Sequence, residues 1–513
     1  MIHLIPTEAK RFRTFGWVQD PSDFRSLCDV VAIFDETSLK HQELAGQVIP
    51  ALVEERDGRQ RLLDALNQRP LRISYTDLVG TSFTPRSAAR CNGIVQAAVR
   101  GQVRPFIGDW PADNFVRWAH ALGFLRYGYQ GDAFELTETG KALAQARTQG
   151  EELNSQEKEL LTSAVLAYPP AVRILSLLGE GEGAHLTKFE LGKQLGFVGE
   201  DGFTSLPQTV LVRSLASSKD AKEKNKMKTD WDGSSDKYAR MIAKWLEKLG
   251  LVKQEAKPVT VTLAGRKYTE SIGQSYVITG LGITALNRTL GKSRHKRIPK
   301  NVSFEMMATK GDDREYLRTR RTCVLKAVSE GKGRVSYTEI QKYLEALGLQ
   351  EDEATIRDDV QGLIHIGLNI AAGERECVWK DEINDLILPV PKKLAKSSQS
   401  ETKEKLREKL RNLPHEYLSL VDLAYDSKQN RLFEMKVIEL LTEECGFQGL
   451  HLGGSRRPDG VLYTAGLTDN YGIILDTKAY SSGYSLPIAQ ADEMERYVRE
   501  NQTRDELVNP NQW

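Results

Sequence analysis

The sequence predicts a mostly α-helical protein with small β-hairpins, followed by a smaller α/β domain. Its 513 residues are too many for one hydrophobic core, so we expect several domains. A helix, a glycine and an alternating apolar stretch recur three times before residue 390. A Pro-, Lys- and Ser-rich stretch then separates these repeats from a last segment with strand-like runs.

Each repeat begins with an amphipathic helix whose apolar residues recur at three- and four-residue spacing. The helices begin at Asn114, Asp236 and Ala354, and the glycines that follow them are Gly123, Gly250 and Gly367. A glycine just past a helix accepts the left-handed conformation that closes it. Helix, glycine and hairpin are how a winged helix-turn-helix ends, so we expect three winged-helix-like subdomains. Three unrelated helix–hairpins are the alternative.

The repeats divide the chain into five parts. We expect subdomains over residues 1–150, 151–290 and 291–388, a linker over 389–402, and the last domain over 403–513. The first three should fold independently across the linker. Winged helices bind DNA but also mediate protein contacts, so the pattern favours DNA without establishing it.

Composition narrows the class of protein. Hydrophobic residues make up 40% and charged residues 27%, and no apolar run is long enough to span a membrane. The five cysteines form no CxxC pair, so we expect no zinc site and a reducing cytoplasm as the location.

The net charge of the chain is only +1, but residues 291–300 and the arginines of 314–321 form basic clusters. Such clusters can neutralise phosphates, or they can be solvated loops.

Three residues lie where a recognition helix would meet base edges, at its N-terminal end. Trp110 precedes the helix of the first repeat, and Asp232 and Lys237 stand at the start of the second. The alternative for Trp110 is that it packs on its own helix.

The last segment should contain a helix over 431–447. This helix should bury a face that consists of Phe433, Val437, Leu440 and Leu441.

The strand-like runs that follow this helix contain a candidate metal site. Residues two apart on a strand share a face, so Asp476 and Lys478 should project together while Thr477 points away. Asp459 stands at the entry of the preceding strand. Two carboxylates that face one point bind Mg²⁺, and a nearby lysine stabilises an attacked phosphate, as in PD…DxK nucleases. Two ordinary turn acids are the alternative.

Long collinear stretches resemble the FokI-like type IIS restriction endonucleases, from about Thr14 to the last residue. They include "RWAHALGF", "HLTKFELGKQLGF", "GSSDKYARMI", "HLGGSRRPDG" and "DTKAYSSGYSLPIAQADEMERYV". The resemblance implies three winged-helix-like recognition subdomains, a linker and an α/β PD-(D/E)xK nuclease domain that uses Mg²⁺. It also implies a short asymmetric double-stranded DNA site, GGATG in the type enzyme, with cleavage at a fixed distance outside it.

The resemblance assigns roles by motif. The catalytic set is Asp459, Asp476 and Lys478, with the two aspartates holding the metal; the base readers are Gln19, Arg86, Trp110, Asp232 and Lys237; and the dimer pair is Asp492 and Arg496. The implied partners are DNA, a second copy bound transiently through the nuclease domain, and a methyltransferase that protects the host. Asp20 and Asp232 depart from the family pattern and leave the recognised sequence open. Asp492 and Arg496 could instead form an ordinary intrahelical pair.

The end of the chain also departs from the family, whose nuclease continues beyond the position of Trp513. We therefore expect a nuclease domain that is incomplete at its C-terminus. The chain would then bind DNA through its recognition subdomains but cut it inefficiently. The alternative function is a sequence-specific DNA-binding protein without cleavage activity.

Overall fold

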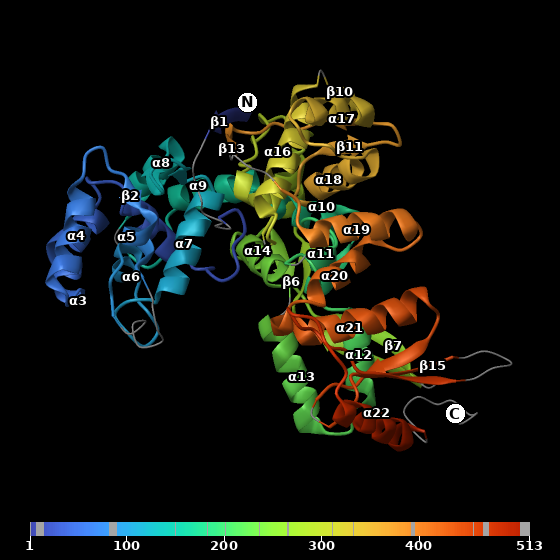
Figure 1. Cartoon of the computed structure of the whole chain (residues 1–513). Helices are drawn as coiled ribbons and strands as arrows, with labels where there is room; N and C mark the ends of the chain where they lie inside the picture. Colours follow the sequence, from blue (N-terminus) through green and yellow to red (C-terminus); the bar gives the residue numbers. More distant parts are fainter. Residues whose placement is uncertain are drawn as a thin grey trace. The chain divides into compact units, whose positions relative to one another are not determined.

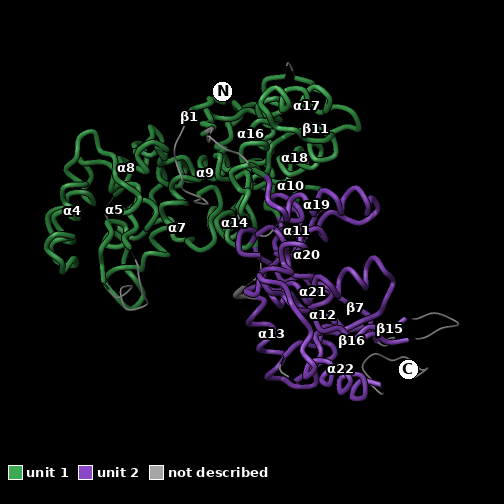
Figure 2. The backbone as a smooth tube through the Cα atoms, in the orientation of Figure 1, with its two compact units in different colours: residues 1–182, 240–253, 278–395 green, residues 183–239, 254–277, 396–513 purple. Residues whose placement is uncertain are grey.

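The structure is a computed structural model of the whole chain (Figure 1). It describes residues 2–6, 15–81, 90–148, 150–181, 183–200, 202–234, 236–263, 266–309, 311–331, 333–390, 395–454, 456–464 and 471–502. The chain forms two compact units (Figure 2). Unit 1 consists of residues 1–182, 240–253 and 278–395, and unit 2 of residues 183–239, 254–277 and 396–513.

The first repeat lies in unit 1 and contains the expected helix, glycine and hairpin. Helix α7 (Asp109–Ala121) is followed by Gly123, whose φ is 78°, and then by strands β3 (Leu125–Gly128) and β4 (Ala133–Leu136). These strands pair antiparallel, and β2 (Ile73–Ser74) joins them in the order β2-β4-β3. Helices α5 (Tyr75–Val79) and α6 (Ile94–Ala98) precede α7 along the chain.

The third repeat, also in unit 1, has the same order of elements. Strand β10 (Arg334–Ser336) leads to α17 (Tyr337–Ala346) and α18 (Glu353–His365), and Gly367 follows with φ at 109°. Strands β11 (Ile370–Ala372) and β12 (Glu376–Trp379) then complete a sheet in the order β10-β12-β11.

The second repeat differs from the expectation in its hairpin. Helix α14 (Lys237–Lys248) reaches Gly250, whose φ is 73°, and a short strand β6 (Val252–Gln254) follows. The long hairpin is a separate feature, because β7 (Lys257–Leu263) pairs along its whole length with β8 (Arg266–Ile272). A helix that the sequence did not predict, α13 (Ala221–Ser234), precedes α14.

A parallel strand pair in unit 1 joins distant parts of the chain. Strand β1 (Ile2–Pro6) pairs in register with β13 (Leu386–Val390). Of the linker expected over 389–402, residues 389–390 therefore lie in β13 and residues 398–402 in α19 (Ser398–Lys409), while 391–394 lie outside the described residues.

The last segment forms a small sheet with helices in unit 2. Strands β14 (Gln448–His451), β15 (Gly460–Tyr463) and β16 (Gly472–Leu475) pair antiparallel in that order. Helix α21 (Asn430–Glu439) precedes the sheet and α22 (Ile488–Asn501) follows it. Among the described residues β16 is an edge strand.

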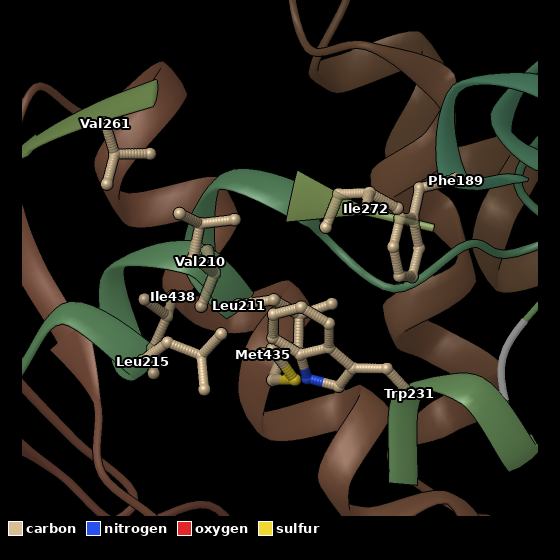
Figure 3. Packing of buried hydrophobic residues seen from close by; sticks show 10 residues of the cluster. Phe189, Val210, Leu211, Leu215, Trp231, Val261, Ile272, Met435 and Ile438 are labelled. Carbon is tan, nitrogen blue, oxygen red and sulfur yellow. The ribbon is translucent and has the colours of Figure 1, made fainter. Parts of the chain in front are cut away.

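Two expectations about this segment were wrong, because it shares a hydrophobic core with residues 183–277. Met435 and Ile438 are the buried apolar residues of α21, whereas the predicted face is only half-buried. They pack in one cluster with Val210, Leu211 and Leu215 of α12 (Gln208–Ser217), as Figure 3 shows. This part of the second repeat therefore does not fold independently of the last segment.

Buried charges reinforce the same junction. Lys436 is 2% exposed, and its Nζ lies 3.0 Å from Glu416 Oε2 and 2.5 Å from Glu439 Oε2. Lys193, from the second repeat, reaches Glu416 Oε1 at 2.9 Å. Buried ion pairs destabilise a fold when one partner is lost, so this network makes the junction sensitive to substitution.

Across the described residues, no single helix is long and apolar enough to cross a membrane. Helices α9 (Ser155–Ala167) and α10 (Pro169–Gly179) are long and apolar enough only when they are taken together, and the chain bends by 82° between them.

Candidate active site and nucleic-acid interface

The register of the small sheet brings Asp459 and Asp476 together. Asp459 immediately precedes β15 and Asp476 immediately follows β16. Because the two strands run antiparallel with Gly460 opposite Leu475, the residues just outside that pair lie at the same end of the sheet. The two carboxylates, 17 positions apart in sequence, are therefore neighbours.

Hydrogen bonds hold one oxygen of each carboxylate. Asp476 Oδ2 accepts from Lys478 Nζ and from Gln490 Nε2, each at 2.7 Å. Asp459 Oδ2 accepts from the backbone N and the Oγ1 of Thr477, at 2.6 and 2.9 Å. The sequence correctly placed Asp476 and Lys478 on one side. It was wrong about Thr477, whose side chain contacts Asp459, because β16 ends at Leu475 and strict alternation ends with it.

The second oxygen of each carboxylate remains available. Within the described residues, neither Asp459 Oδ1 nor Asp476 Oδ1 accepts a hydrogen bond. Mg²⁺ takes carboxylate oxygens and keeps several waters, so two such oxygens fit it. No group of three or more His, Cys, Asp or Glu is arranged for a metal in the described part of the chain. Asp459 and Asp476 are the carboxylates that would hold the ion.

Burial and neighbouring charges shift the pKa values of Asp459 and Lys478. Burial raises the pKa of Asp459 to about 6, and the nearby negative charges of Glu434 and Asp476 add to the effect. Burial lowers the pKa of Lys478, but the hydrogen bond to Asp476 and its charge outweigh burial and raise that pKa overall. A cation between the carboxylates would relieve their repulsion.

Sequence reasoning missed three neighbours of the site, which are Glu434, His451 and Gln490. His451 Nε2 lies 2.8 Å from Glu434 Oε2, and His451 pairs across the sheet with Gly460, next to Asp459. The stretch that contains Gln490 was visible in the sequence, but only the fold shows that α22 returns to Asp476.

The predicted base readers have different surroundings. Trp110 is 52% exposed near the start of α7, so it is not a packed staple. Lys237 is exposed at the first position of α14. Gln19 is half-buried and has a polar partner. Arg86 and the side chain of Asp232 lie outside the described residues.

Parts of both basic clusters are unavailable to phosphates, which corrects the expectation from sequence. Arg318, Arg320 and Arg321 are buried in α16 (Arg314–Glu330). Lys300 is fully buried, and its Nζ lies 3.6 Å from Asp381 Oδ1. The lysines and arginines of these two clusters that remain exposed are Lys292, Arg294 and Lys296.

The predicted dimer helix, α22, leaves its Asp492 exposed. Arg496 does not form the intrahelical pair with Asp492. Its guanidinium instead lies 2.9 Å from Glu493 and 3.7 Å from Glu500. The residues just before and at the start of the helix are apolar and exposed, with Leu486 at 65% and Ile488 at 84%.

Comparison with known proteins places this arrangement in a family. Models of FokI match the chain in four parts: recognition-domain subdomain 1 over residues 13–146, subdomain 2 over 157–294, the D3 domain over 307–375 and the cleavage domain over 396–513. The type II restriction enzyme FokI of Planomicrobium okeanokoites is 46% identical over 509 residues, which cover 98% of this chain and 86% of FokI. The chain belongs to the FokI family of type II restriction enzymes.

Another member of the family and two solved structures also match the chain. The type II restriction enzyme StsI of Streptococcus sanguinis is 34% identical over 97% of this chain and 83% of StsI. The structure of restriction endonuclease FokI matches with a TM-score of 0.88, covering 98% of this chain and 86% of that one. The structure of FokI bound to DNA matches with a TM-score of 0.89, covering 98% and 87%. Enzymes of the FokI family are site-specific deoxyribonucleases, and Asp459, Asp476 and Lys478 lie within the match to the cleavage domain.

Proposed function

We propose that this chain is a type IIS restriction endonuclease. It binds a short asymmetric site in double-stranded DNA, GGATG by resemblance, and hydrolyses phosphodiester bonds at a fixed distance outside it with Mg²⁺. The observation that carries the proposal is the pair of adjacent carboxylates, Asp459 and Asp476, each with one oxygen held and one available beside Lys478.

The proposed roles follow from the contacts. Asp459 and Asp476 would hold Mg²⁺, which when bound polarises the phosphodiester and promotes attack by water. Thr477 fixes the orientation of Asp459 through two hydrogen bonds. The ammonium of Lys478, kept protonated by Asp476, would stabilise the negative charge that develops on the attacked phosphate.

DNA recognition is assigned to three winged-helix-like subdomains within residues 1–388. A DNA-bound structure of the relative FokI and the strand–helix–hairpin order of the repeats support this assignment. Trp110 and Lys237 stand near helix starts, where side chains reach base edges. Lysine or arginine would donate to guanine and the indole would cover a thymine methyl, with Gln19, Arg86 and Asp232 as further readers by resemblance.

Cleavage of both strands is assigned to a transient homodimer through α22. In a two-fold dimer, Asp492 of one copy would meet Arg496 of the other, because the same patch faces itself. The exposed Leu486 and Ile488 supply apolar area beside this pair. A cognate methyltransferase would protect the host DNA.

The alternative of DNA binding without cleavage has less support, because all three proposed catalytic residues are present and two are joined by a hydrogen bond. The expectation of an incomplete nuclease stays a prediction, and residues 503–513, the last of that domain, lie outside the described residues.

Cleavage of defined DNA tests the proposal. The purified chain is incubated with a duplex that contains one GGATG and with a duplex in which that site is scrambled, each with Mg²⁺ or with EDTA. We expect cuts at one fixed distance from the site, only with Mg²⁺ and only in the first duplex. Specific binding without any Mg²⁺-dependent cut would favour the DNA-binding alternative, and equal cutting of both duplexes would overturn the recognition assignment.

A further inference from the structure

A continuous series of contacts joins Asp476 to the exposed face of α22. Gln490 Nε2 donates to Asp476 Oδ2 at 2.7 Å and lies 3.3 Å from Glu493 Oε2. Glu493 Oε1 in turn accepts from Arg496 Nη2 at 2.9 Å and from Tyr497 Oη at 2.8 Å. The proposed metal ligand and the proposed dimer residue are therefore three side-chain contacts apart.

Gln490 is the donor that can fix Asp476 relative to the rest of the domain. The other donor to Asp476 Oδ2 is Lys478, which lies two residues away on the same non-strand segment and moves with it. Gln490 belongs to a different element, a helix of 14 residues, and is half-buried. Its hydrogen bond therefore ties the segment after β16 to α22.

The chemistry of the amide also suits this position. A second lysine or arginine would add positive charge and weaken cation binding, whereas a neutral amide donates a hydrogen bond and leaves the carboxylate charge intact. With Oδ2 occupied by two donors, the orientation of Asp476 leaves Oδ1 as its free oxygen. Hydrogen-bond partners of metal ligands orient those ligands in this way.

We propose that Gln490 is a positioning residue for Asp476 and that, through Glu493, it connects the metal site to Arg496 on the dimer face. The inference rests on the proposed function. It adds a role for α22: the helix orients a catalytic carboxylate as well as presenting a dimer surface.

A titration of the DNA-free chain with Mn²⁺ tests the positioning role of Gln490 without relying on cleavage. The EPR signal of free Mn²⁺ measures how much of the metal is bound. Gln490→Met keeps a helix-forming side chain of similar length and removes the donor. We expect its Mn²⁺ affinity to fall by roughly 10- to 100-fold with an unchanged melting temperature. The matched control is Gln502→Met, the same change at an exposed position at the end of α22, which should bind as the unmodified chain does. Equal affinity of Gln490→Met and Gln502→Met would overturn the positioning role.

Asp476→Ala in the same titration separates the inference from the proposed function. If Asp476→Ala abolishes Mn²⁺ binding while Gln490→Met leaves it unchanged, the metal site stands and the positioning role is wrong. If Asp476→Ala binds Mn²⁺ as the unmodified chain does, the metal site itself is wrong and the inference falls with it.

The connection to the dimer face has its own variant. Arg496→Gln releases Glu493 Oε1 from its cationic partner and lets Glu493 compete for the Gln490 amide. We expect roughly a twofold or larger decrease in Mn²⁺ affinity, the lower end of what changes along a contiguous network produce. Unchanged affinity in Arg496→Gln, together with a decrease in Gln490→Met, would overturn the connection and keep the positioning role.

Discussion

Asp359 in the third repeat and Asp476 in the last segment both lie beside cations, but their oxygens are filled differently. Asp359 Oδ1 accepts from Arg320 Nη2 at 3.0 Å and Arg321 Nε at 3.1 Å, and Oδ2 accepts from Arg320 Nε at 2.7 Å. Asp476 receives both of its donors on Oδ2 and, within the described residues, none on Oδ1. A carboxylate whose oxygens are both filled by protein donors stabilises the fold. A carboxylate with an oxygen left over has a place for a ligand.

The largest effect should come from removing the carboxylate with the free oxygen. Asp476→Ala should lower the cleavage rate by on the order of 10³-fold, since a metal site supplies several kcal/mol of transition-state stabilisation. Specific DNA binding should be nearly unchanged, because Asp476 is outside the shared core. Single-turnover cleavage and a gel shift measure the two quantities, and a cleavage rate like that of the unmodified chain would contradict the assignment.

The filled carboxylate should show the opposite pattern. Asp359 is 2% exposed, so Asp359→Ala removes the carboxylate that the buried guanidinium groups of Arg320 and Arg321 share and should cost about 3–5 kcal/mol of unfolding free energy. Urea unfolding measures this loss. The cleavage rate per folded molecule at saturating enzyme should remain that of the unmodified chain. If Asp359→Ala kept normal stability but lost cleavage, the structural role of Asp359 would be contradicted.

A smaller effect separates base reading from phosphate contact. Lys237→Ala should weaken binding to the cognate duplex by roughly 1–3 kcal/mol and binding to random DNA much less. Lys296→Ala, in the exposed part of the 291–300 cluster, should weaken both duplexes alike and reduce the salt dependence. Binding titrations at several salt concentrations measure both variants. Equal weakening of the two duplexes by Lys237→Ala would remove it from the base readers.

The smallest expected effect concerns His365, whose side chain is half-buried. Burial and, to a smaller extent, the positive charge of Arg173 together lower the pKa of His365 to about 4. Between that value and its ordinary pKa near 6.5, the unfolded chain binds more protons than the folded one, so stability should fall as pH decreases from about 6.5 to 4. His365→Gln should flatten this dependence. An identical pH profile of unfolding in the variant would contradict the assignment.

Local patterns in the sequence predicted the features that depend on a few consecutive residues. The left-handed glycines 123, 250 and 367 and the side shared by Asp476 and Lys478 are of this kind. The misses depend on partners far along the chain. Arg320 is buried where Asp359 and Glu351 return to it, and α21 buries Met435 and Ile438 because α12 covers that face. Gln490 reaches Asp476 only through the packing of α22, which no spacing rule contains.

The most direct test of the comparison is to locate the cation. Crystals of the chain grown with Mn²⁺ allow an anomalous difference map, in which only the metal and sulfur atoms give strong peaks. We predict a peak within coordination distance of Asp459 Oδ1 and Asp476 Oδ1 and none beside Asp359. A map with no peak at those two oxygens, or with the metal bound at another group of carboxylates, would contradict the account.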